Sequence, residues 1–255
     1  MRTHITIGIS CLLLPLVLFG CSKKEEPSKQ SSKNQPTETV VQNNKQSSNT
    51  RKPLPKYSTG KLQVIAQPDD ISVLVNKHNS LPETFNPKDL ASLNIPFLAS
   101  ASTEKRQLRK EAATQLEKMV NAAKKDNIYL KGVSGYRSHE TQKALFNRYV
   151  KRDGYAKART YSALPGTSEH ETGLSIDITG KDGTCAADDC FAQKPEAEWL
   201  AKHVQDFGFI IRYPKGKEKV TGYKYEPWHI RYVGVKIAKE LTIKGITLEE
   251  YYLHS

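Results

Sequence analysis

The sequence lacks an apolar run long enough to cross a lipid bilayer. Its longest run, residues 5–19, is almost wholly apolar but spans only 15 residues, whereas a membrane-spanning helix needs about 20. One basic residue, Arg2, precedes the run, and Gly20 and Cys21 follow it. A short apolar core between a basic residue and a small residue is typical of a signal peptide rather than of a transmembrane helix.

We expect residues 1–20 to be a signal peptide, after which Cys21 becomes the first residue of the mature protein and carries a lipid. The small residue Gly20 directly before this cysteine fits such a cleavage site. An uncleaved anchor and ordinary secretion are the alternatives. All three place the folded part outside the cytoplasm, and lipidation would make the protein a lipoprotein of the bacterial cell membrane.

Large apolar side chains are almost missing from residues 22–56, where Ser, Thr, Asn and Gln make up 17 of the 35 residues. Such a segment cannot bury enough apolar surface to offset the entropy that it would lose on ordering. We therefore predict that residues 21–56 are a lipidated cysteine followed by a disordered tether. A flexible coil of this length spans roughly 30–35 Å, which would let an anchored domain reach the cell wall.

Acidic residues are in the minority, with 27 Asp and Glu against 39 Lys and Arg, a net charge of +12. The excess is spread along the chain, and the sequence has no arginine-rich cluster, nucleic-acid-binding motif or internal repeat. A basic balance of this kind favours anionic surfaces such as lipid headgroups and wall polymers. We expect no nucleic-acid partner.

Cysteine is scarce, and beyond residue 56 only Cys185 and Cys190 occur. In an oxidising compartment we predict a disulfide that closes the short loop between them, with two free thiols as the alternative. A metal site built on this pair is disfavoured, because no second Cys or His pair stands nearby at the spacing of zinc ligands.

Residues 57–255 have the length of one ordinary domain. The clearest expected element is a helix over residues 103–125, where apolar residues recur every three or four positions. Strands are expected over residues 62–75 and 128–134. Further helices are expected from Ser138 to Gly154, from Pro195 to Gly208, from Gly234 to Lys244 and from Thr247 onward. Helices and strands without regular alternation predict an α+β fold with a largely antiparallel sheet.

Two further stretches carry polar residues suited to chemistry. Residues 174–179 alternate apolar and polar side chains, which predicts a strand with Asp177 on its polar face. His170 precedes this strand, and Gly173 between them lets the chain turn back so that the imidazole approaches the carboxylate. Residues 228–233 also alternate and carry His229, which follows Glu226.

Two histidines and one aspartate suit a catalytic zinc, which takes three protein ligands and keeps a position open for water. Glu226 lies near a ligand without being one, so it is available as a general base. Taken singly, each residue can equally be a structural or solvated side chain. A nucleophilic triad of Ser168 with a histidine and an aspartate is a competitor, but no Gly-x-Ser-x-Gly elbow surrounds this serine.

A resemblance strengthens the zinc interpretation. Residues 168–177, read as Ser-x-His-x-x-Gly-x-x-x-Asp, resemble the signature of the VanY-type zinc carboxypeptidases, which act on the D-alanyl ends of peptidoglycan stem peptides. Residues 226–229 are similar to that family's Glu-x-Trp-His motif, and residues 134–142 to its third motif, in the same order. The resemblance implies the small α+β zinc-peptidase fold shared with the hedgehog signalling domain and the DD-peptidases. It also implies Zn²⁺ held by His170, Asp177 and His229, with Glu226 activating water.

The same resemblance implies roles for three more residues. Arg137 is expected to contact the substrate's terminal carboxylate or the oxyanion that forms during attack, since a guanidinium suits both. Ser168 and Gln142 are expected to contact substrate, although Gln142 can instead brace its helix. The implied activity is removal of the terminal D-alanine from D-Ala-D-Ala or from an L,D-tetrapeptide. Separately, we expect the protein to be a monomer. A non-catalytic zinc module that binds wall or signals, and an endopeptidase of the same fold, are the alternatives.

Overall fold

The computed structural model describes residues 62–254. The predicted signal peptide, Cys21 and the predicted tether lie outside this range. Within it, no helix combines the length and the apolar composition that crossing a membrane requires.

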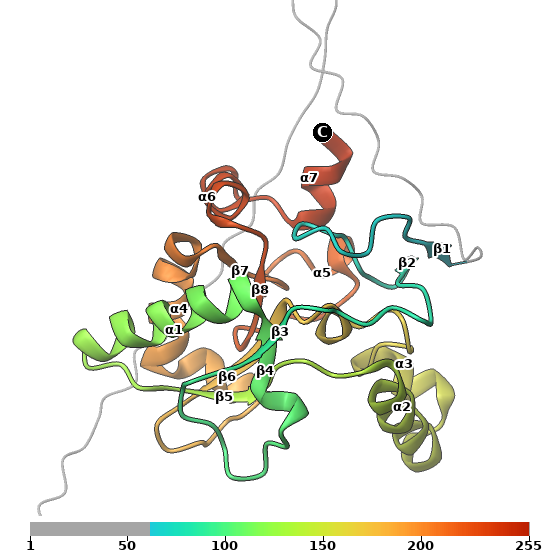
Figure 1. The fold of residues 1–255 in the computed structure, drawn as a ribbon, viewed down its shortest axis with the longest axis horizontal. Coiled ribbons are helices and arrows are strands. Elements are labelled where there is room, and N and C mark those ends of the chain that lie inside the picture. The colour runs from blue at the N-terminus through green and yellow to red at the C-terminus, as the bar shows by residue number, and fades with distance from the viewer. Residues whose placement is uncertain (1–61, 255) are drawn as a thin grey trace, which may run out of the picture. The chain divides into compact units, whose positions relative to one another are not determined.

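A four-stranded antiparallel sheet forms the centre of the domain (Figure 1). Its strand order is β5-β6-β8-β7, and each neighbouring pair runs antiparallel. Two small sheets lie outside it: β1 pairs with β2, and β3 pairs with β4. This arrangement confirms the predicted α+β fold with a largely antiparallel sheet. The strands are β1 (Gln63–Val64), β2 (Asn79–Ser80), β3 (Leu90–Ser92), β4 (Gln107–Arg109), β5 (Leu130–Ser134), β6 (Ser175–Gly180), β7 (Phe209–Ile211) and β8 (His229–Tyr232).

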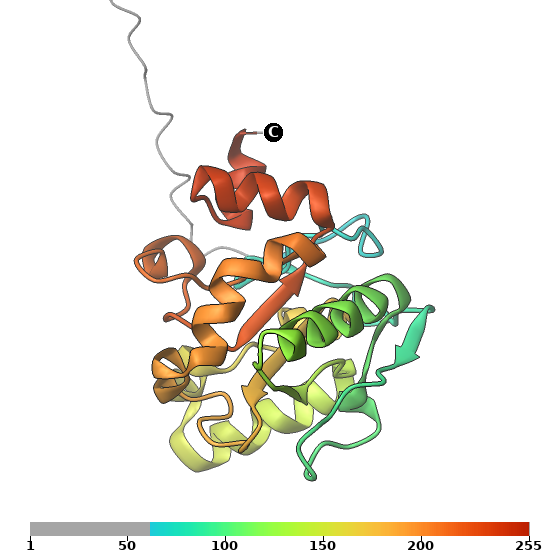
Figure 2. The ribbon, with the colours of Figure 1, turned by 90° about the vertical axis from the view of Figure 1, so that its left-hand side faces the viewer.

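Helices flank this sheet. The apolar side chains of β6 and β8 pack with Leu116 of α1 and Leu200 of α4 in one core cluster, and Figure 2 shows both helices close to β8. In both views α2 and α3 lie together on one side, and α6 and α7 lie on the other. The helices are α1 (Lys110–Lys125), α2 (His139–Asp153), α3 (Tyr155–Tyr161), α4 (Pro195–His203), α5 (Glu218–Thr221), α6 (Val235–Lys244) and α7 (Leu248–His254).

The helix boundaries that depend on local signals are confirmed. The Ser138 hydroxyl accepts a hydrogen bond from the Thr141 backbone amide at the start of α2. Gly245, with a φ of 62°, ends α6 in the left-handed conformation. Thr247 and Glu250 form the reciprocal bonds of a capping box at the start of α7, at 2.8 and 3.2 Å.

Two predicted elements are shorter than expected. The helix expected over residues 103–125 begins only at Lys110, because Gln107–Arg109 instead form β4 and pair with β3. Leu108 and Ala112 are both buried, so the apolar spacing continues across the junction of strand and helix. The strand expected over residues 62–75 is limited to β1, whose two residues pair with β2. Further along the same segment the Asp70 carboxylate accepts the Ser72 amide at 3.0 Å, which is typical of a turn.

Candidate metal centre

The register of the central sheet brings two remote residues together. Asp177 of β6 lies directly opposite His229 of β8, and directly opposed residues of an antiparallel pair point to the same face. His170 lies in a short 3₁₀ turn before β6, which ends at Gly173 with a φ of 67°. A Cβ at this glycine would lie 2.9 Å from a methyl group of Leu90, so the tight return of the chain requires glycine.

The three predicted ligands converge at one point. His170 Nε2 lies 3.4 Å from Asp177 Oδ2, and His229 Nδ1 lies 3.0 Å from Asp177 Oδ1. The candidate ligand atoms all lie within 4.8 Å of one another, and all three residues are buried. Ligand atoms about 2.0–2.2 Å from a tetrahedral zinc lie about 3.3–3.6 Å apart. The donor set and its spacing therefore fit Zn²⁺.

Hydrogen bonds orient the two imidazoles. His170 Nδ1 donates to the Gly135 carbonyl at 2.9 Å, which turns Nε2 toward Asp177. His229 presents its other nitrogen, Nδ1, to Asp177, because its Nε2 faces Glu169. His170 therefore directs its nitrogens to Gly135 and Asp177, and this geometry argues against the alternative in which Ser168 is a nucleophile that His170 activates.

Charges and burial set the protonation of the cluster. Burial lowers the pKa of His170 to about 3. Burial alone would raise the pKa of Asp177, but electrostatic interaction with the two neighbouring imidazoles and the hydrogen bond with His229 lower it. Burial likewise opposes the protonation of His229, yet its bonds to Asp177 and Glu169 raise its pKa to about 9. Two carboxylates around this imidazole thus create a site that attracts positive charge.

Glu226 lies beside the cluster in the loop before β8. Its backbone amide donates to the Tyr213 carbonyl at 3.0 Å, and its carbonyl accepts the His229 amide at 3.1 Å, so its position relative to that ligand is fixed. Burial raises the pKa of Glu226 to about 7, and the charge of Asp177 adds to the effect. A carboxylate with such a pKa can take and return a proton near neutral pH.

These residues line a cavity of about 300 Å³. Ser168 and Trp228 border it on the sheet side, and Tyr149 of α2 and Tyr161 at the end of α3 border it on the helical side. The two tyrosine rings pack edge to face at 5.1 Å. The cavity therefore has a metal-binding floor and an aromatic side wall.

Arg137 enters the same cavity from the turn between β5 and α2. Its Nη1 donates to Gln142 Oε1 at 2.7 Å, and its Nη2 donates to the Ser134 hydroxyl at 3.2 Å. The amide nitrogen of Gln142 donates in turn to the Ala163 carbonyl at 2.8 Å. Both ends of the Gln142 amide are therefore used within the protein, which favours its interpretation as a brace for Arg137 over that of a substrate contact.

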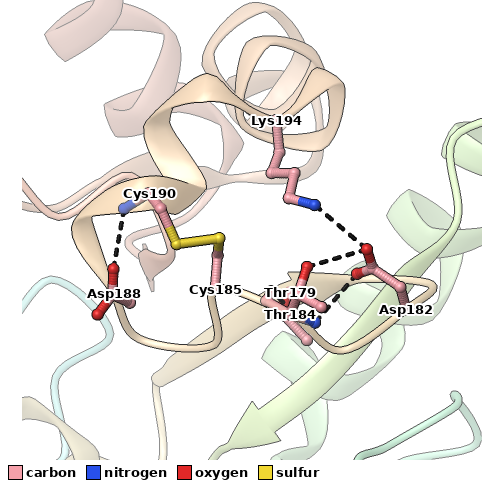
Figure 3. Close-up of a disulfide and its surroundings, with 7 residues drawn as sticks. All are labelled: Thr179, Asp182, Thr184, Cys185, Asp188, Cys190 and Lys194. Carbon is pink, nitrogen blue, oxygen red and sulfur yellow. Dashed lines mark hydrogen bonds and ion pairs between the residues drawn. A yellow bond between two sulfur atoms is a disulfide. The ribbon is translucent and has the colours of Figure 1, made fainter.

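A disulfide loop forms another border of the cavity. Cys185 and Cys190 are bonded, with an S–S distance of 2.01 Å, and Ala187 between them lines the cavity. Figure 3 shows the loop closed further by Asp188, whose carboxylate accepts the Cys190 amide. Asp189 pairs with Lys224, which is also a lining residue.

Glu169 lies between Ser168 and His170 in the first motif, and sequence patterning gave it no role. The structure shows that it forms buried ion pairs. Its side chain is fully buried, and its carboxylate pairs with Arg212 and Arg231, both at 2.7 Å. The charges of these arginines hold the pKa of Glu169 well below its usual range, although burial alone would raise it. The available signal was an arginine directly after one apolar strand, Phe-Ile-Ile-Arg212, and another within a second strand, Ile-Arg231-Tyr.

Comparisons with known proteins agree with this geometry. Residues 105–235 match the family described as VanY: D-alanyl-D-alanine carboxypeptidase. The chain is 36% identical over 186 residues to the bifunctional D-Ala-D-Ala dipeptidase and D-Ala-D-Ala carboxypeptidase VanXYC of Enterococcus gallinarum, which covers 70% of this chain and 92% of that protein.

Two solved structures are similar in fold. The LdcB LD-carboxypeptidase has a TM-score of 0.72 and 43% identity, covering 75% of this chain and 89% of that one. A mutant of the vancomycin-resistance D,D-pentapeptidase VanY in complex with Zn(II) has a TM-score of 0.57 and 31% identity, covering 71% of this chain and 98% of that one.

Proposed function

This chain belongs to the VanY family of D-alanyl-D-alanine carboxypeptidases, and we propose that it removes the terminal D-alanine from peptidoglycan stem peptides in a zinc-dependent hydrolysis. One observation carries the proposal. His170, Asp177 and His229 converge on the floor of a cavity that also holds Glu226 and Arg137. The metal-binding residues, the candidate base Glu226 and the guanidinium of Arg137 therefore line the same cavity.

The three floor residues would hold the ion, and Glu226 would move the proton. When bound, zinc lowers the pKa of water to about 7 and polarises the scissile carbonyl. Glu226 takes a proton from the attacking water and returns it to the amine of the leaving D-alanine. Its pKa of about 7 suits both transfers.

Arg137 supplies positive charge at a fixed position. Its bonds to Gln142 and Ser134 hold the guanidinium in the cavity, so little ordering is required when a negative group binds. It either clamps the terminal carboxylate of the peptide or stabilises the oxyanion of the transition state. A carboxylate clamp favours a carboxypeptidase over an endopeptidase, since an internal bond has no free carboxylate one residue away.

Both D,D- and L,D-carboxypeptidases are among the similar structures. The higher identity and TM-score to the LD-carboxypeptidase, 43% and 0.72, against 31% and 0.57 for the D,D-pentapeptidase, lead us to favour the tetrapeptide with a terminal L,D-bond. This proposal does not specify which amino acid stands at the third position of the stem peptide.

Digestion of purified muropeptides, read by mass spectrometry, tests the proposal. We expect loss of one alanine from tetrapeptides, and loss of this activity when a chelator removes zinc. Loss of alanine from pentapeptides alone would favour D,D-specificity. Two internal fragments would indicate an endopeptidase, and zinc binding without any cleavage would indicate a non-catalytic module.

We also propose that the enzyme acts as a monomer outside the cytoplasm, anchored to the cell membrane through a lipid on Cys21. The support for the anchor and the location is the sequence: a short apolar run, a small residue before Cys21, and a polar segment after it. The wild-type protein should incorporate a labelled fatty acid, and the Cys21→Ser variant should not, without loss of activity on soluble muropeptides. Equal labelling of the variant would contradict a lipid on Cys21.

A further inference from the structure

The carboxylate of Glu169 divides its two oxygens between different partners. Oε1 accepts Arg212 Nε and Arg231 Nη1, both at 2.7 Å. Oε2 accepts the Ser175 hydroxyl at 3.1 Å and faces His229 Nε2 at 3.4 Å. One oxygen is therefore held by the arginines, and the other is directed toward a candidate zinc ligand.

His229 is consequently held between two carboxylates. Its Nδ1 lies 3.0 Å from Asp177, on the side of the metal cluster, and its Nε2 lies on the side of Glu169. The ring of Tyr213 stacks on the imidazole at 5.1 Å, which restricts its rotation. An imidazole that donates Nε2–H to a carboxylate presents the lone pair of Nδ1 to a metal.

The arginines that hold Glu169 are themselves fixed from two sides of the domain. Arg212 makes two bonds to Glu249 of α7, at 2.6 and 2.9 Å. Arg231 donates to the carbonyls of Ile71 and Val73, at 3.1 and 2.8 Å. The side chains of both arginines and of Glu169 are completely buried, so the loss of one partner would leave a buried charge uncompensated.

We propose that Glu169 is a positioning residue for the zinc ligand His229: its Oε2 accepts the Nε2–H, which fixes Nδ1 as the coordinating atom. The inference rests on the metal site of the proposed function. A purely structural role would need only Oε1, because both arginines bind that oxygen. The second oxygen faces His229 and Ser175, and this division assigns the carboxylate its role toward the metal.

The substitution Glu169→Gln tests the assignment in the full-length protein. A glutamine has one acceptor oxygen, so it can serve the arginines or His229 but not both. We expect the zinc affinity, measured by competition with a chelator, to fall about 10–100-fold, the usual effect of removing an outer partner of a ligand. Cobalt(II) substitution should show a changed visible absorption spectrum, because the orientation of His229 changes.

Glu249→Gln is the matched control. It removes the same charge from the same buried network, but Glu249 contacts Arg212 and not a metal ligand. We expect thermal unfolding to shift downward in both variants, with zinc affinity and cobalt spectrum close to wild type only in Glu249→Gln. Equal losses of zinc affinity in the two variants would reduce Glu169 to a structural role and overturn the proposal.

A third variant covers the case in which Glu169→Gln does not fold. Glu169→Asp keeps the charge but is one methylene shorter, so it cannot reach the arginines and His229 together. A zinc affinity below that of Glu249→Gln would support the proposal, and a wild-type affinity would overturn it. If the wild-type protein bound no zinc, the proposed function would fail as well; a zinc-binding wild type with unaffected variants would remove only this inference.

Discussion

The floor of the cleft and its disulfide wall are held by opposite kinds of contact. Beneath the floor residues His170, Asp177 and His229, the ion pairs of Glu169 with Arg212 and Arg231 have side chains that are 0% exposed. On the wall, the pair between Lys224 and Asp189 has side chains that are 56% and 70% exposed. Buried pairs are costly to break, while exposed pairs contribute about 0–1 kcal/mol. The difference indicates that the reacting groups are fixed rigidly, and that the wall can vary to suit a substrate.

The largest expected effect is at the candidate base. Glu226→Ala should lower kcat about 10²–10⁴-fold, the contribution of a positioned general base, while zinc content stays at wild type because Glu226 is not among the three converging residues. Release of D-alanine and metal analysis measure the two quantities. Near-normal turnover would mean that another group accepts the proton, and loss of zinc would make Glu226 part of the metal site.

The next effect is at Arg137. Arg137→Ala should lower kcat/KM about 10²–10³-fold, the usual cost of losing one donor to a developing charge. A loss confined to kcat would assign Arg137 to the oxyanion, and a rise in KM would assign it to the terminal carboxylate. Arg148→Ala, at an exposed arginine of α2, is the control and should behave as wild type. Equal effects of the two substitutions would contradict a specific role for Arg137.

A moderate effect is expected from pH. Glu226 must be ionised to act as a base, and burial raises its pKa to about 7. Protonation below that pH removes the base, so kcat/KM should fall about tenfold per pH unit on the acid side. Bound zinc adds positive charge nearby and lowers the pKa of Glu226, so the fall in kcat/KM should begin at a pH below 7. A kcat/KM profile that stays flat down to the pH at which zinc is released would contradict the assignment.

The smallest effect on chemistry is expected at the wall. Replacing Cys185 and Cys190 with Ser should reduce the free energy of unfolding by about 2 kcal/mol, since the closed loop is short. KM for muropeptides should rise, because Ala187 of this loop lines the cavity, and kcat should change little. Denaturant unfolding and steady-state kinetics measure both. A drop in kcat as large as that of Arg137→Ala would show that the wall also positions reacting groups.

Sequence patterning could predict the parts of this molecule that depend on neighbours in the chain. The cap at Ser138 and the capping box at Thr247 and Glu250 are local signals, and the structure bears them out. The motifs carrying His170 and His229 were recognised by resemblance, although alternation alone indicated only strands with polar residues. The strand register then placed Asp177 opposite His229.

The missed features depend on partners far away in the sequence. Gln107–Arg109 form a strand because they pair with β3. No pattern within residues 107–109 themselves predicts this pairing. Arg212 is 37 residues from Glu249 and 43 from Glu169. An arginine directly after an apolar strand implies a buried counter-charge, but the identity of that counter-charge comes only from the fold.

The bonds of Arg212 to α7 and of Arg231 to the segment at Ile71 and Val73 also bear on how the domain comes apart. Detachment of α7, by proteolysis or local opening, would remove both bonds of Arg212 to Glu249 and expose the buried ion pairs of Glu169 to water, a larger change than the loss of one charge in Glu249→Gln. Local unfolding of α7 or of the segment at Ile71 and Val73 would then disturb the metal site, so metal release and unfolding should be one cooperative event. A protease that cleaved between α6 and α7 would inactivate the enzyme without touching its cleft.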